Sequence, residues 1–278
     1  MMKMVHFVKM HGAGNDFVLI DDRAEQFPVH DHLRLAAFAA ARTGIGCEGV
    51  ILVQPSKIAD FRMVFFNPDG TEADLCGNGA RCVAAFAREI GAAKGCAMTF
   101  ETRAGLVDAE VLDAGKVKVW MPEPHDRRYG LDVEGMKGDF IVAGVPHFVV
   151  PCESVAAVDV EKLGRRLRLA AAFEPNGTNV DFAQFIPPNK ILLRTYERGV
   201  EAESGACGTG AVATAVVAVE TKGLSLPLQV HTSQGFNLTI DGDWRCAKCT
   251  GFTLTGPVKK VFEGDLDLDS LDIGNEME

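Results

Sequence analysis

The feature that most constrains this 278-residue chain is a short unit that occurs twice. Each copy is a cysteine, then Gly-Asn-Gly or Gly-Thr-Gly, then a run rich in alanine and valine; the two cysteines are Cys76 and Cys207. Each run is long enough for about four turns of helix. The first run is apolar on nearly all sides, which is typical of a helix enclosed by strands. Similar features precede the two copies in the same order, so we expect a duplicated fold with a pseudo-twofold axis.

The two units have the chemistry of a carboxylate site with a reactive thiol. Glycines after the cysteine let the backbone turn sharply and leave the first N–H groups of the helix open to an anion. The helix dipole favours the thiolate, which lowers the pKa of the thiol from about 8.5 toward neutrality. Two such cysteines facing each other could take a proton from one face of a carbon atom and supply one to the other. We expect one thiolate and one thiol at rest, assigned to the pair because the groups couple.

Composition bounds the class of protein. Hydrophobic residues make up 47% of the chain, and the mean hydropathy is +0.08, as in ordinary globular proteins. No apolar run reaches the roughly 18 residues that span a bilayer, and the start alternates apolar with polar residues like a strand, so no membrane partner and a cytoplasmic location are expected. The net charge of −10 argues against nucleic acid. Eight cysteines without a secretion signal favour reduced thiols.

Hydrophobic periodicity predicts strands and two helical segments in each half. In the first half, strands are expected at 5–9, 49–54, 61–66, 98–102, 105–112 and 116–121, and residues 11–22 are expected to form a glycine turn that leads into a further strand. Helices are expected at 30–41 and 80–93. In the second half, strands are expected at 177–185, 191–199, 228–232, 235–241 and 250–255, with a basic amphipathic helix at 163–172 and the second Ala/Val run near 211–219.

A Pro-rich break at 121–126 predicts the domain boundary. We expect a first domain of residues 1–122, joined by the segment 264–278, and a second domain of residues 123–263. The closing segment 263–278 is acidic and is expected to fray as a solvated terminus.

Four motifs carry a resemblance to a known family: GAGNDF (12–17), NPDGTEADLCGNGAR (67–81), GTNVDF (177–182) and YERGVEAESGACGTGA (196–211). In this order, across almost the whole chain, they resemble the diaminopimelate epimerase family. The resemblance implies an α/β (α+β) fold of two pseudo-symmetric domains, each a curved mixed or antiparallel sheet wrapped around a central helix. It implies an active site in the cleft between the domains, where LL-diaminopimelate is converted to meso-diaminopimelate. This reaction lies on the path to lysine and peptidoglycan. It also implies a homodimer and neither pyridoxal phosphate nor metal.

The resemblance also assigns residues. Cys76 and Cys207 become the acid/base pair, and His147 and Glu197 support proton movement at the two thiols. Arg198 has the planar fork suited to a distal carboxylate. The substrate-binding positions fall on Asn15, Asn67, Gly77, Asn78, Asn179, Arg198, Gly208 and Thr209. The chain departs from the family pattern at Val145, where many relatives have asparagine, and at Cys47-Glu48-Gly49, and both departures bear on the identity of the substrate.

Other interpretations stay open at the level of sequence. The same cysteine pair would serve a racemase of another amino acid, of the histidine or proline type, and a non-catalytic small-molecule-binding scaffold would need neither cysteine. Asn15 is either an amide aimed at a ligand or a turn residue that tolerates positive φ, and His147 is either a core histidine or a catalytic helper. Cys246 and Cys249 supply only two ligands, so no metal site is expected there. Neither glycine unit has the lysine of a phosphate-binding loop.

Overall fold

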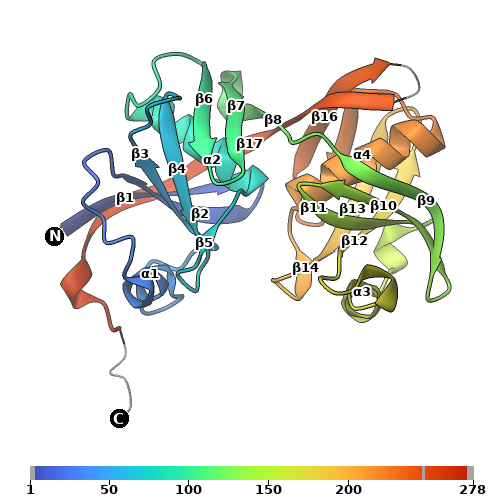
Figure 1. Ribbon diagram of the computed structural model, residues 1–278, viewed down its shortest axis with the longest axis horizontal. Coiled ribbons are helices and arrows are strands. Elements are labelled where there is room, and N and C mark those ends of the chain that lie inside the picture. The colour runs from blue at the N-terminus through green and yellow to red at the C-terminus, as the bar shows by residue number, and fades with distance from the viewer. Residues whose placement is uncertain (1–3, 246–247, 274–278) are drawn as a thin grey trace, which may run out of the picture. The chain divides into compact units, whose positions relative to one another are not determined.

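The computed structural model describes residues 4–245 and 248–273. Its elements gather into two compact units, labelled in Figure 1. Unit 1 holds the described residues up to Val119 and from Val258 onward, and unit 2 is Trp120–Pro257. The strand β17 (Lys248–Asp267) contributes its first part to unit 2 and its last part to unit 1. No helix within the described residues combines the length and the apolar character that crossing a bilayer demands.

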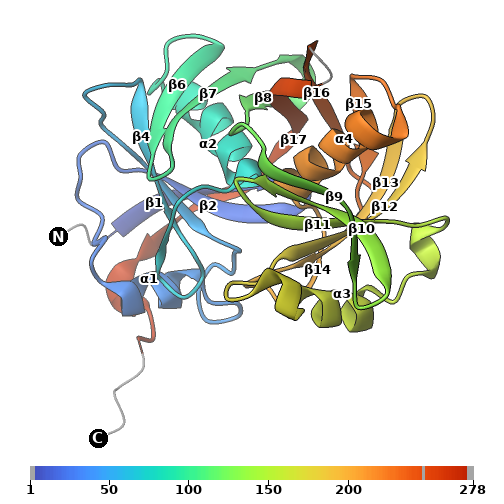
Figure 2. The ribbon, with the colours of Figure 1, turned by 45° about the vertical axis from the view of Figure 1, so that its right-hand side comes forward.

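Unit 1 is a curved sheet around one enclosed helix. Its other strands are β1 (Met4–Gly12), β2 (Asn15–Asp21), β3 (Val50–Gln54), β4 (Phe61–Phe66), β5 (Glu72–Ala73), β6 (Ala97–Thr102), β7 (Gly105–Val111) and β8 (Lys116–Trp120). Helix α2 (Gly77–Glu89) packs against β1, β2, β3 and β7 and is buried on nearly all sides (Figure 2). Helix α1 (His32–Ala39) packs on the other face of the sheet, where alternate strand residues point.

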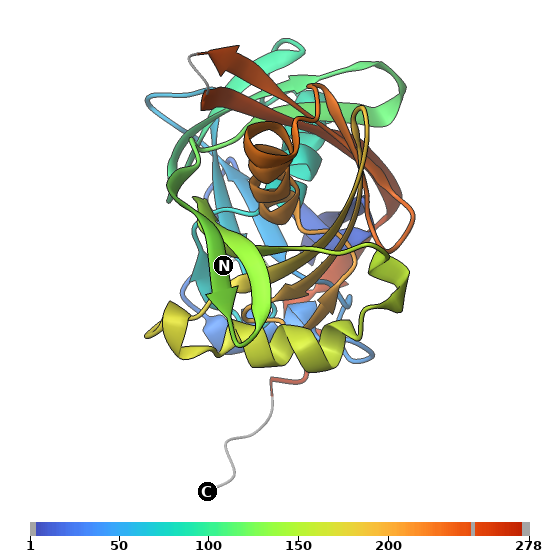
Figure 3. The ribbon, with the colours of Figure 1, turned by 90° about the vertical axis from the view of Figure 1, so that its right-hand side faces the viewer.

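Unit 2 follows the same plan. Its other strands are β9 (His125–Val133), β10 (Met136–Ala143), β11 (Val145–Pro151), β12 (Asn179–Ile186), β13 (Lys190–Glu197), β14 (Ala202–Ser204), β15 (Leu228–His231) and β16 (Asn237–Arg245). Helix α4 (Gly208–Lys222) is enclosed by β10, β11, β12 and β16 (Figure 3). Helix α3 (Val160–Arg168) packs on β12, β13 and β14 from the opposite face.

The strand pairings confirm the predicted duplication. In unit 1, β2 and β3 are parallel, β4 is antiparallel to β3 and β5, and β6 runs parallel to β4. In unit 2, β11 and β12 are parallel, β13 is antiparallel to β12 and β14, and β15 runs parallel to β13. The motifs GAGNDF (12–17) and GTNVDF (177–182) both end in Asp-Phe, but this shared pair does not follow the repeat. Asp16 lies on β2, whereas Asp181 lies on β12, the counterpart of β3.

Several segments differ from the expected elements. The helix expected at 163–172 begins at Val160, because the Asp159 side chain caps it by accepting from the Lys162 N–H (3.1 Å). The strand β9 was not expected, since its residues are mostly exposed and charged and show no apolar alternation. The acidic end does not simply fray. The strand β17 pairs with β1 as far as Asp267, and Leu268 and Leu271 are buried in the core of unit 1.

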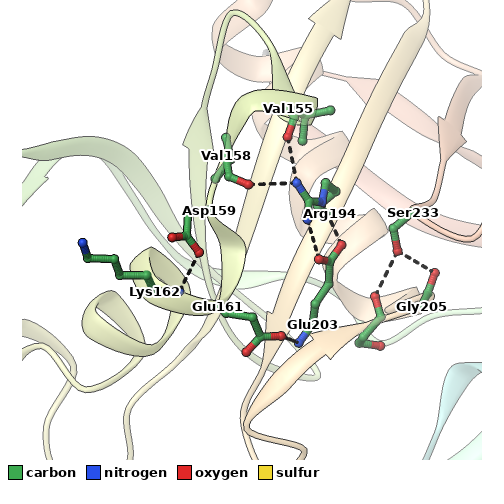
Figure 4. A network of polar contacts seen from close by, with 10 residues as sticks. Val155, Val158, Asp159, Glu161, Lys162, Arg194, Glu203, Gly205 and Ser233 are labelled. Atoms are coloured by element: carbon green, nitrogen blue, oxygen red, sulfur yellow. Dashed lines mark hydrogen bonds and ion pairs between the residues drawn. The ribbon is translucent and has the colours of Figure 1, made fainter.

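A polar network fixes the chain that leads into the second cysteine unit (Figure 4). The Arg194 guanidinium on β13 donates to both carboxylate oxygens of Glu203 on β14 (2.8 and 2.5 Å) and to the carbonyls of Val155 and Val158. Further along, the Ser233 hydroxyl donates to the carbonyl of Gly205 (3.4 Å). A bidentate guanidinium–carboxylate pair has a defined geometry, so these contacts hold β14 in place just before Cys207.

Candidate active site

Cys76 lies at the N-cap of α2, as the sequence predicts. Its backbone is extended, and its carbonyl accepts the first helical bond from Ala80 N–H (2.7 Å). The thiol is half-buried, and its sulfur donates to the side-chain oxygen of Asn15 at 3.7 Å. The following residues, Gly77 and Asn78, form the first turn of α2, where N–H groups have no partner within the helix.

Polar side chains around Cys76 form a continuous chain of hydrogen bonds. Asn15 donates to Glu48 and accepts from the Asn78 amide (3.0 Å). Asn78 in turn accepts from the Arg81 guanidinium (2.7 Å), which also donates to the Gly77 carbonyl (3.2 Å). Positive φ falls on Ala13 and Gly14 rather than on Asn15, so Asn15 is not kept for its turn conformation. Its amide is instead fixed beside the sulfur.

Arg81 is fully buried, and sequence reasoning missed it. Within residues 4–245 and 248–273 no carboxylate forms an ion pair with it, and its Nε has no hydrogen-bond partner. Burial lowers the pKa of Arg81, while the thiols of Cys82 and Cys76 act in the opposite direction. Burial also raises the pKa of Cys82 to about 12, which keeps that thiol protonated. A guanidinium in this position favours negative charge on Cys76. The available signal was a charged residue in an otherwise apolar helix.

Cys207 occupies the matching N-cap of α4 but in a different electrostatic environment. Its side chain is buried, and its sulfur lies 3.4 Å from the Thr209 hydroxyl. Burial raises the pKa of Cys207 well above its ordinary value, and the carboxylates of Glu197 and Asp181 raise it further, against hydrogen bonds from Thr209 and Gly210 N–H. The expected lowering by the helix dipole is therefore wrong for Cys207, because desolvation and two carboxylates outweigh it. Burial and the two carboxylates therefore favour the protonated form of Cys207.

His147 forms a buried polar cluster with two side chains on the neighbouring strands. Its Nδ1 lies 2.7 Å from one carboxylate oxygen of Asp181, and the Thr195 hydroxyl donates to the other at 2.7 Å. His147 and Asp181 are 0% exposed and Thr195 is 2% exposed. His147 Nε2 has no hydrogen-bond partner among the described residues. Asp181 is not among the site residues predicted from sequence, although Asn179-Val-Asp181 alternates polar and apolar residues in a buried strand.

The remaining predicted site residues lie at strand ends. Glu197 is half-buried at the end of β13 and lies close enough to Cys207 to act on its pKa. Asn179 accepts from the backbone N–H of Arg198 (2.8 Å), and the Arg198 guanidinium reaches the Asn176 carbonyl (3.4 Å). Asn67 follows β4 in a turn and donates to the Thr71 hydroxyl (3.1 Å). Asn179 thus fixes the backbone of Arg198, and Asn67 holds its own turn.

Unit 1 therefore brings together Asn15, Cys76, Gly77 and Asn78, and unit 2 brings Glu197 and Asp181 beside Cys207. Gly208 and Thr209 form the first turn of α4. The meeting of the two sets across a cleft stays a prediction. Among the described residues, no three His, Cys, Asp or Glu side chains gather as a metal ion requires. Cys246 lies outside the described residues, and so does the side chain of Cys249.

We expect Glu197→Gln to move the titration of Cys207 to lower pH. The substitution removes a negative charge that raises the pKa of this thiol, so its thiolate forms more easily. The measurement is the rate of iodoacetamide labelling of Cys207 across a pH series, resolved by peptide mass spectrometry. Glu153→Gln, at an exposed position, is the matched control and should leave the midpoint unchanged. A midpoint that Glu197→Gln leaves in place or raises contradicts the assignment.

Comparison with known sequences covers nearly the whole chain. The family model described as diaminopimelate epimerase matches residues 7–125 and 140–261. A diaminopimelate epimerase of Aquifex aeolicus (strain VF5) is 44% identical over 283 residues, which cover 96% of this chain and 100% of the relative. One from Hydrogenobaculum sp. (strain Y04AAS1) is 37% identical over 277 residues, which cover 93% of this chain and 97% of the relative.

Solved structures share the fold. A Bacillus anthracis phenazine biosynthesis protein of the PhzF family has a TM-score of 0.72 at 19% identity, covering 95% of this chain and 99% of that one. A hydroxyproline epimerase from Agrobacterium vitis, with bound trans-4-OH-L-proline, has a TM-score of 0.67 at 18% identity, covering 96% and 93%. These likenesses concern the fold alone, and they confirm the predicted α+β architecture. With both halves matched by one family model and a relative that is 44% identical, the chain belongs to the diaminopimelate epimerase family.

Proposed function

We propose that the protein interconverts LL- and meso-diaminopimelate by proton transfer at one carbon atom, without a cofactor or metal. The observation that carries the proposal is the pair of cysteines at equivalent N-caps, Cys76 on α2 and Cys207 on α4, in a chain of this family. Inversion of a stereocentre requires a base on one face and an acid on the other. Two identical groups let the reaction run in both directions.

In the proposed reaction, Cys76 acts on the LL epimer as the base. Its thiolate takes the Cα proton, and the S–H of Cys207 supplies a proton to the opposite face. The products are the meso epimer, a Cys76 thiol and a Cys207 thiolate, so the next turnover in the reverse direction uses the opposite assignment. The buried Arg81 cation near Cys76 and the raised pKa of Cys207 support this starting state.

The proposed transition state places negative charge on the substrate α-carboxylate. Gly77-Asn78 and Gly208-Thr209 form the first turns of two helices, and helix N-termini stabilise an anion. We propose that Arg198 binds the distal carboxylate of the substrate and that Asn15, Asn67 and Asn179 are further substrate-binding residues. His147 and Glu197 pass protons to and from the thiols. We also propose a cytoplasmic homodimer with no nucleic-acid or membrane partner, as the family resemblance implies.

The test is deuterium incorporation from D₂O under reducing conditions. LL-Diaminopimelate should gain deuterium at Cα and yield the meso form. Proline and histidine, added separately, should stay unlabelled. Exchange confined to one of these other amino acids would show a racemase of different specificity, and exchange with none of them would leave a binding scaffold; either outcome refutes the proposal.

A further inference from the structure

The repeat allows one set of buried positions in unit 2 to be compared with its counterpart in unit 1. Leu19 pairs with Ile51 across β2 and β3 as Val149 pairs with Asp181 across β11 and β12. Across the next pair of strands, Ile51 faces Phe65 as Asp181 faces Thr195. Three positions on the side of the sheet facing the enclosed helix therefore correspond: Phe17, Ile51 and Phe65 in unit 1 with His147, Asp181 and Thr195 in unit 2.

The enclosed helices confirm this correspondence. A Cβ added at Gly79, the second glycine of the first cysteine unit, would meet Ile51 Cδ1 at 3.0 Å and Phe17 at 3.5 Å. A Cβ added at the matching Gly210 would meet Asp181 Oδ1 at 2.4 Å. The same helix position thus touches an isoleucine in unit 1 and a carboxylate in unit 2.

The fold itself does not require polar groups at these positions. In unit 1 they hold two phenylalanine rings in edge contact, with centroids 6.0 Å apart, and an isoleucine, all buried. In unit 2 a carboxylate is buried at 0% exposure, which costs several kcal/mol unless its hydrogen bonds compensate for lost hydration. Apolar side chains such as those of unit 1 would be sufficient for packing at these positions. The polar set therefore has a role beyond stability.

We infer that Asp181 is a positioning residue for His147. Its carboxylate accepts the Nδ1–H of the imidazole and the Thr195 hydroxyl proton, and this fixes the tautomer in which Nε2 carries the lone pair. The inference rests on the proposed role of His147 in proton transfer. Asp181 sets the orientation of the His147 ring and the nitrogen that carries its proton.

The proton balance is simple. A proton that leaves a thiol S–H for Nε2 leaves a thiolate and turns the imidazole into an imidazolium, whose charge the Asp181 carboxylate balances. When the proton leaves Nε2 again, neutral imidazole remains with its Nδ1 proton still on Asp181. Asp181 gains no proton, and no further reactant is needed.

The other groups around His147 are compatible with this arrangement. On β10 its cross-strand partner is Ile141, which has no charge. Cys207 at the N-cap of α4 is the titratable group on which the charges of Asp181 and of Glu197 from β13 both act. Asp181 is thus the charged group in direct hydrogen-bond contact with the ring.

The test is Asp181→Asn, which keeps the shape of the side chain and removes its charge. We expect kcat for epimerisation to fall about 10²-fold, since the imidazolium loses its counter-charge, while KM changes less than about threefold. The matched control is Asp139→Asn. Asp139 is also a buried carboxylate (5% exposed), facing Val149 from β10, but it accepts from the backbone N–H of Gly130 (2.8 Å). Its kcat should stay within about threefold of wild type.

A measurement on the unmodified protein covers the case in which Asp181→Asn fails to fold. Nitrogen-15 NMR of the histidine rings, with His147 assigned by loss of its signals in His147→Gln, should show a proton on Nδ1 and none on Nε2 in the neutral ring. The opposite tautomer would overturn the inference, and so would a folded Asp181→Asn protein with wild-type kcat. Wild-type protein that exchanges no Cα proton would instead refute the proposed function, so the two failures are distinguishable.

Discussion

Replacing either Cys76 or Cys207 by alanine is expected to lower kcat for epimerisation by at least about 10³-fold while the fold stays intact. In the proposed reaction, each variant removes the group that serves one face of the stereocentre, and the remaining thiol acts on the other face alone. Alanine fits both positions, because each side chain lies at an N-cap where the backbone and not the sulfur begins the helix. Circular dichroism and the melting temperature check the fold, and chiral chromatography measures the epimers.

The two variants should also differ from each other in deuterium exchange. In Cys207→Ala, the Cys76 thiolate can still remove the Cα proton of the LL epimer and return a deuteron to the same face, so label enters without inversion. In Cys76→Ala, Cys207 remains and acts on the opposite face, so label should enter the meso epimer without inversion and should not enter the LL epimer. Cys96→Ala, at an exposed thiol, is the control and should behave like wild type. Near-normal epimerisation by either active-site variant would refute the two-base assignment.

The positions of the two cysteines were predictable from sequence because local signals define them. Glycines directly before an apolar run specify a helix start, and the run itself specifies an enclosed helix. Both Cys76 and Cys207 are found at the N-caps of such helices. The two-domain architecture was predictable from the family motifs, because they occur in both halves of the chain.

The electrostatics of the thiols were not predictable, because they depend on which side chains the fold brings near. Asp181 reaches Cys207 and His147 only through the register of β11, β12 and β13, and a sequence does not carry that register. The Asp-Phe pairs at 16–17 and 181–182 are alike in sequence, yet they lie on strands that are not counterparts in the repeat. The effect of burial on the pKa of Cys207 was not predictable either. Burial raises this pKa more than the helix dipole lowers it, and burial depends on the tertiary packing around α4.

Gly210→Ala is expected to lower kcat by about 10²-fold or more and to destabilise unit 2 by about 1–3 kcal/mol. The new Cβ would lie 2.4 Å from Asp181 Oδ1 and 3.1 Å from its Cγ, so the carboxylate must move. Movement breaks the hydrogen bonds to His147 and Thr195, each 2.7 Å long, and leaves buried polar groups unsatisfied. Steady-state kinetics and urea unfolding measure the two effects.

The repeat supplies the matched control for this glycine. In Gly79→Ala the new Cβ meets the flexible end of Ile51 at 3.0 Å, while Met63 and Phe17 lie at an ordinary 3.5 Å. Alanine is favoured over glycine in a helix by about 1 kcal/mol, so the stability of this variant should be unchanged or higher. A double-mutant cycle isolates the contact: in an Asp181→Ala background the clash is absent, and Gly210→Ala should cost no stability there. If Gly210→Ala were as destabilising in that background as in wild type, the cost would come from the helix itself. The close approach of α4 to Asp181 would then not be what keeps a glycine at this position.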